Sequence, residues 1–190
     1  MGSHKMFQIN NARRVPCAIL ALGMLVSACA KEPQVTHSGI DQDRMTLALL
    51  EVDAKHKRGA RVWCVPFARD LSGIEIYGNA NLWWDKAKGL YPRSQAPVPG
   101  SVLAFKSTGR NPMGHVAVVS QVLSERTIQV DHANWEKNMV TMKMLAVDVS
   151  KANDWTAVRL ESVPGSLGST YATHGFIYPV NTQTQIASRD

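Results

Sequence analysis

Apolar residues change their spacing near residue 101, and this change constrains the fold more than any other feature. Before it, residues 44–59 and 64–73 carry apolar side chains at helical spacing, and residues 79–90 run from an asparagine to a glycine stop. After it, short apolar or alternating segments recur at hairpin distances. These segments are 101–105, 115–123, 127–135, 142–150, 156–163 and 175–180. Together they predict an α+β domain with N-terminal helices packed on a C-terminal antiparallel sheet, not a doubly wound parallel sheet.

Length and charge limit the class of protein. A chain of 190 residues with 45% hydrophobic content can form one domain plus a leader. The formal net charge is +6, but the first 28 residues contribute three basic residues and no acid. The remainder has a mild basic excess without a long Lys/Arg run, so we expect no nucleic-acid partner.

The first 28 residues have the features of an export signal. Arg13 and Arg14 precede an apolar run, 16–28, that is shorter than the roughly 20 residues needed to span a membrane. The run closes on LVSAC, which resembles the bacterial lipobox and implies cleavage before Cys29 and lipidation of its thiol. We therefore expect a lipoprotein anchored through Cys29 and facing the periplasm, on the outer membrane rather than the inner. A plain secretory signal or a buried core helix is the alternative.

The rest of the chain divides into three parts. Residues 29–43 are polar and are predicted to be a tether, residues 44–180 form the predicted folded domain, and residues 181–190 form a tail. Cys17 would leave with the signal and Cys29 would carry lipid. Cys64 would then be the single thiol of the mature protein, which excludes an intrachain disulfide.

Cys64 stands where a helix is expected to begin, in RVWCVPFARDLSG. The positive end of the helix dipole there favours the thiolate, which is the nucleophilic form. His115 opens a predicted strand in GHVAVV, where the backbone would fix its orientation as a general base.

A third polar residue would orient the imidazole, and 127–135 offers Asp131, His132 and Asn134. Strand alternation places His132 and Asn134 on the face of Ile128 and Val130, and Asp131 on the other. If that apolar face meets the helix, His132 and Asn134 face Cys64. Asp131 would take the role only if a bulge reversed the alternation.

The segments WCVPFARDLSG, GNANLWW, PVPGSVLAF, GHVAVVSQV and VDHANW resemble, in this order, the CHAP domain of cysteine, histidine-dependent amidohydrolases and peptidases. The resemblance covers about residues 60–135. It implies a papain-like fold, Cys64 as nucleophile, His115 as base, and the peptide stems of peptidoglycan as substrate, cut as an N-acetylmuramoyl-L-alanine amidase or a peptide endopeptidase. His132 stands where the family usually has glutamate, while Asn134 and Trp135 match. Trp63 replaces the glutamine often found before the nucleophile, so only the Cys64 backbone N–H is assigned to the oxyanion hole.

Other interpretations stay open. Cys64 and His115 could be buried structural residues, and Cys64, His115 and His132 could bind zinc, although they lack the close ligand spacing of structural sites. We expect neither a metal nor an organic cofactor. A second enzymatic hypothesis is an amidase of a small amine conjugate such as glutathionylspermidine. A third is a catalytically degenerate lipoprotein that binds cell wall.

Overall fold

The computed structural model describes residues 39–180. The predicted signal peptide, most of the tether with Cys29, and the tail lie outside the described residues. Within them, no helix is long and apolar enough to cross a membrane. The helical elements precede the main strands: α1 (Gln42–Lys57), α2 (Cys64–Ser72), the 3₁₀ helix η1 (Ala80–Leu82) and α3 (Trp83–Lys86). The strands are β1 (Arg93–Ser94), β2 (Val102–Phe105), β3 (His115–Ser124), β4 (Thr127–Ala133), β5 (Val140–Asp148), β6 (Ala157–Val163) and β7 (Ser166–Ile177).

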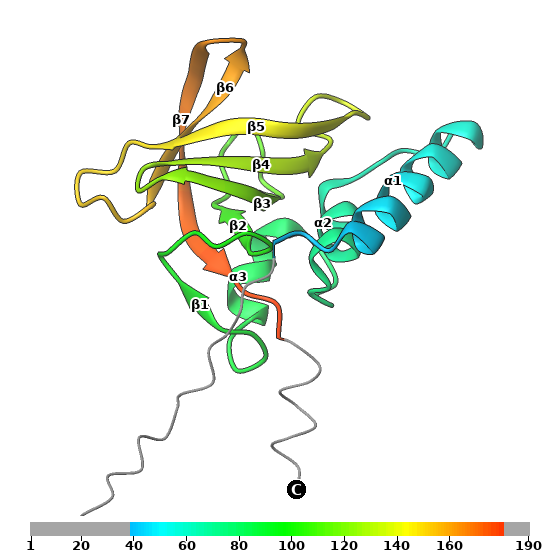
Figure 1. Ribbon diagram of the computed structural model, residues 1–190, viewed down its shortest axis with the longest axis horizontal. Helices are drawn as coiled ribbons and strands as arrows, with labels where there is room; N and C mark the ends of the chain where they lie inside the picture. The colour runs from blue at the N-terminus through cyan, green and yellow to red at the C-terminus, as the bar shows by residue number, and fades with distance from the viewer. Residues whose placement is uncertain (1–38, 181–190) are drawn as a thin grey trace, which may run out of the picture. The chain divides into compact units, whose positions relative to one another are not determined.

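The strands form an antiparallel sheet that closes on itself. Its order is β1-β7-β2-β3-β4-β5-β6, and β6 also pairs with β7, so β2 to β7 make a six-stranded barrel. Helices α1 and α2 lie together to one side of the barrel, and α2 packs on β3 and β4 (Figure 1). The predicted α+β class with an antiparallel sheet is confirmed. The closer likeness to papain-like enzymes stays a prediction.

Helix α2 begins and ends for local reasons. Trp63 before it is extended, with no side-chain cap, and Gly73 after it takes a left-handed φ of 74° and donates its N–H to the Arg69 carbonyl. Phe67 and Leu71, one turn apart, are buried. This apolar face fixes α2 on the sheet and thereby fixes Cys64 at its first turn.

Two predicted helices differ from the structure. The helical spacing within 44–59 predicts one apolar face of Met45, Leu47, Leu49 and Val52. In α1, Met45 and Val52 pack against the core, but Leu47 and Leu49 are 64% and 39% exposed. The angular step between residues 47 and 45 or 49 is about 200°, so Leu47 cannot share their face. The predicted helix 79–90 shortens to η1 and α3, because the chain then turns, with Leu90 and Tyr91 both donating to the Ala87 carbonyl.

The last strand starts earlier than predicted. Strand β7 runs over Ser166–Ile177, whereas its apolar segment placed the prediction at 175–180. Its first half is polar and pairs with β6 across the hairpin at Gly165, while its second half pairs with β2. Hydrogen bonding to two neighbours therefore sustains a strand that hydrophobic pattern alone does not reveal.

The two faces of the sheet form two cores. Val102, Val116 and Val118 pack with the helices, whereas alternate residues fill the barrel. Ile128 and Val130 belong to the barrel interior. The sequence analysis placed His132 and Asn134 toward Cys64 on the condition that Ile128 and Val130 face the helix. That condition is wrong, because the closed sheet buries Ile128 and Val130 against other apolar residues inside the barrel.

Candidate active site

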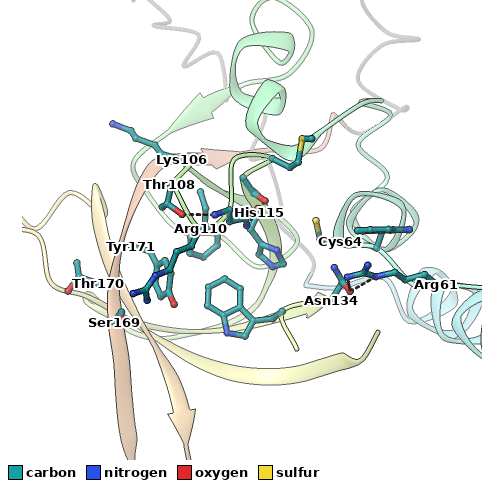
Figure 2. Close-up of a pocket in the computed structure, with 17 residues that line it drawn as sticks. Arg61, Cys64, Lys106, Thr108, Arg110, His115, Asn134, Ser169, Thr170 and Tyr171 are labelled. Carbon is teal, nitrogen blue, oxygen red and sulfur yellow. Dashed lines mark hydrogen bonds between the residues drawn. The ribbon is translucent and has the colours of Figure 1, made fainter. Parts of the chain in front are cut away.

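Cys64 is the first residue of α2 and is partly buried. Its side chain packs against the helix-side core and lines a cavity of about 770 Å³. The backbone of Val116, next to His115 on β3, hydrogen-bonds the thiol. The packing of α2 on β3 thus brings the sequence-predicted nucleophile and base to one cavity (Figure 2).

His115 is the first residue of β3 and only 4% exposed. The preceding Gly114 has a φ of 69°, and a Cβ there would lie 2.8 Å from the backbone nitrogen of Asn81. Asn81 donates that N–H to the Met113 carbonyl. Glycine is thus required at 114 for the backbone to approach Asn81 and direct His115 into the cavity.

His132 on β4 contacts His115 directly. His115 Nε2 and His132 Nδ1 are 3.0 Å apart and hydrogen-bonded, with the rings edge to face. This bond leaves Nδ1 as the His115 nitrogen available to the thiol. For Nδ1 to accept a proton, His115 must donate its Nε2–H to His132, which then carries its own proton at Nε2. That His132 nitrogen is buried without a hydrogen-bond partner in the described part of the chain.

Burial determines the protonation states of His132, His115 and Cys64. It lowers the pKa of His132 to about 4, and together with repulsion from His132 it lowers the pKa of His115 well below 6.5. It also raises the pKa of the Cys64 thiol above 9.0, although hydrogen bonds from the Val116, Val65 and Cys64 backbones lower it in part. The expected depression of the thiol pKa at the helix start is therefore wrong, because desolvation outweighs the helix end. At neutral pH all three side chains are uncharged.

Asp131 lies on the opposite face of β4. Its Oδ1 accepts from the Lys143 backbone N–H at 2.6 Å, and it does not line the cavity. A register shift does occur here, but the extra residue is on β5: Val130 and His132 pair with Met144 and Thr141. Strand β4 therefore keeps its alternation, and Asp131 is not turned toward His115.

Asn134 lines the cavity but makes no bond to either histidine. Its φ is 60°, since the chain leaves β4 at this point. Its Oδ1 accepts from Nε and Nη2 of Arg61, both at 3.2 Å, and from the Asn138 N–H at 2.9 Å. Asn134 thus joins the segment before Cys64 to the segment after β4.

Trp135, which follows Asn134 in the segment that resembles the CHAP domain, contacts both histidines of the site. Its ring stacks on His132 with centroids 5.5 Å apart and meets His115 edge to face at 5.0 Å. It also lines the cavity, where it shields both imidazoles from water. Its position directly after Asn134 was the available signal.

The cavity walls include two segments that the sequence did not indicate. One is the loop between β2 and β3, and the other is the polar half of β7 (Figure 2). The lining residues are Arg61, Trp63, Cys64, Phe105, Lys106, Thr108, Gly109, Arg110, Asn111, Met113, Gly114, His115, Asn134, Trp135, Ser169, Thr170 and Tyr171. Among residues 39–180 no three His, Cys, Asp or Glu side chains are grouped closely enough to hold a metal ion.

Comparison with known families agrees with this geometry. Residues 55–134 match the CHAP domain. The matched segment contains Cys64, His115, His132 and Asn134, and the match indicates a cysteine/histidine amidohydrolase or peptidase, a class that typically acts on peptidoglycan. No curated protein and no solved structure matches the chain.

Proposed function

We propose that this protein hydrolyses an amide bond in the peptide part of peptidoglycan, as an N-acetylmuramoyl-L-alanine amidase or a peptide endopeptidase, with Cys64 as nucleophile. The observation that carries the proposal is the His115–His132 hydrogen bond. It occupies Nε2 of His115 and leaves Nδ1 for the thiol that lines the same cavity. A histidine with a purely structural role would have no need to line a cavity together with a cysteine at the start of a helix.

Proton transfer accompanies attack in this mechanism, because thiol and imidazole are both neutral at rest. Cys64 Sγ attacks the substrate carbonyl as its proton passes to His115 Nδ1. The backbone N–H of Cys64 at the start of α2 stabilises the tetrahedral oxyanion. His115 then protonates the leaving amine, and water releases the acyl group from sulfur. We infer a papain-like disposition of nucleophile and base, with a helix carrying the thiol and a strand carrying the imidazole.

His132 acts as a neutral hydrogen-bond acceptor in this scheme. The bond to His132 Nδ1 holds the His115 ring and its tautomer, and it steadies the imidazolium that forms during attack. Burial keeps the pKa of His132 near 4, so His132 does not compete for the proton at neutral pH. Asn134 holds Arg61 beside the nucleophile segment.

Digestion of isotope-labelled muropeptides, read by mass spectrometry, tests the proposal and identifies the bond cut. Cys64→Ala and His115→Ala should abolish turnover, and His132→Ala should reduce it by about 10- to 1000-fold. Asp131→Ala is the matched control on the same strand and should have a mild effect. Cleavage that survives Cys64→Ala would contradict the mechanism. Release of an amine from glutathionylspermidine alone would favour the small-conjugate amidase, and wall binding without cleavage would favour a degenerate binding protein.

We also propose that Cys29 carries a lipid anchor and that the domain faces the periplasm from the outer membrane. The support is the LVSAC sequence, followed by Ala30 and Lys31 with no aspartate after the cysteine. Cells fed a labelled fatty acid should label the parent protein and not Cys29→Ala, which should move to the soluble fraction. An unlabelled parent protein would contradict the anchor.

A further inference from the structure

The charged side chains that line the cavity are all positive. Arg61, Lys106 and Arg110 contribute to its walls, and no aspartate or glutamate does. None of the three forms an ion pair within residues 39–180, where the ion pairs lie on α1, between Arg69 and Glu75, and between Arg126 and Asp148. Three unpaired cations around one concave surface produce a positive potential that attracts anions.

Arg61 is held in place although it pairs with no acid. Its guanidinium lies over the Trp63 ring at 4.0 Å from the centroid, and Nε and Nη2 both donate to Asn134 Oδ1. These contacts use one edge of the guanidinium and leave Nη1 unbonded within the described residues. A fixed guanidinium loses little conformational entropy when it binds a carboxylate.

Lys106 and Arg110 approach from a different element. Both lie in the exposed loop between β2 and β3, and neither side chain has a hydrogen bond within residues 39–180. In Figure 2 they lie on the far side of His115 from Arg61, with Cys64 on the Arg61 side. An extended peptide that crosses Cys64 would therefore meet a cation on each side of the reacting bond.

We propose that these cations select an anionic peptide: Arg61 binds a carboxylate on one side of the amide that is cut, and Lys106 with Arg110 binds a carboxylate on the other. The identity of the peptide as a peptidoglycan stem rests on the proposed function. The carboxylate preference rests on the cavity itself and is open to a test that needs no turnover.

The test compares alkylation of Cys64 by iodoacetate, an anion, and by iodoacetamide, its neutral analogue. Both react with the same thiolate, so their rate ratio at one pH cancels changes in thiol pKa and reports the potential at sulfur. The rate with iodoacetate divided by the rate with iodoacetamide should fall by about 2- to 5-fold in Arg61→Gln and in Arg110→Gln at low salt, because each variant removes a cation that attracts the anionic reagent. Lys151→Gln, which removes an exposed cation outside the cavity, should leave the ratio unchanged. Added salt should reduce the wild-type ratio toward that of the variants.

A ratio that stays at the wild-type value in both cavity variants would overturn the proposal. Arg110 has no side-chain partner in the described residues, so Arg110→Gln keeps the test decisive even if Arg61→Gln weakens the fold through Asn134. A second arm uses stem peptides with free and with amidated carboxylates. Wild type should prefer the free form in kcat/KM, and the two variants should lose that preference. Absence of cleavage of either peptide would count against the proposed function. The alkylation ratio would still test whether the cations of the cavity attract an anion to Cys64.

Discussion

Acidification should destabilise the fold through His132. The unfolded chain binds a proton at the ordinary histidine pKa of 6.5, whereas burial lowers the pKa of His132 in the folded protein to about 4. Between these values the unfolded state holds the extra proton. The free energy of unfolding therefore falls as the pH falls from 6.5 toward 4.

The magnitude follows from the size of the pKa difference. The difference between the ordinary pKa of 6.5 and a pKa of about 4, at about 1.4 kcal/mol per pKa unit, corresponds to about 3 kcal/mol lost across this range. His115 adds to the loss with the same sign, because its pKa is also lowered. Asp131 acts in the opposite sense, because burial raises the pKa of its carboxyl and folding then favours its protonated form.

Urea unfolding followed by tryptophan fluorescence at pH 7, 6, 5 and 4.5 measures the effect. His132→Gln should show a shallower decline in unfolding free energy than wild type, while Asp131 contributes equally to both and cancels. The slope with pH is the readout, since the substitution also lowers stability at every pH. Superimposable slopes for wild type and His132→Gln would refute the reasoning.

Two further predictions concern the approach of β3 and the thiol. Gly114→Ala should lower the free energy of unfolding, measured by urea unfolding, by about 1–3 kcal/mol. The added Cβ would lie 2.8 Å from the backbone nitrogen of Asn81, at a residue whose φ is left-handed. Gly109→Ala is the control and should change the free energy of unfolding little, because no atom lies within 4 Å of the added Cβ. The rate at which iodoacetamide alkylates Cys64 should still rise with pH above 9.0, because burial raises the thiol pKa. A plateau reached near neutral pH would contradict this.

The local periods of the sequence were sufficient for the class of fold and for the position of the candidate nucleophile. Helical spacing and the Gly73 stop predicted α2 with Cys64 at its start, and alternation predicted β3 and β4 with His115 and His132 upon them. These features depend on backbone geometry over a few residues, which a single sequence contains. Asp131 and His132 separate onto opposite faces for the same reason.

Closure of the sheet was decided only by tertiary structure. The β6–β7 pairing completes the barrel, gives Ile128 and Val130 an interior of their own, and extends β7 through polar residues. Other packing steps decided the site. Pairing of β3 with β4 brings His115 to His132, and packing of α2 on the sheet buries Cys64 and brings Arg61 to the same cavity as the β2–β3 loop. Each depends on desolvation and on charges brought together from distant parts of the chain, and neither quantity exists until the surfaces meet.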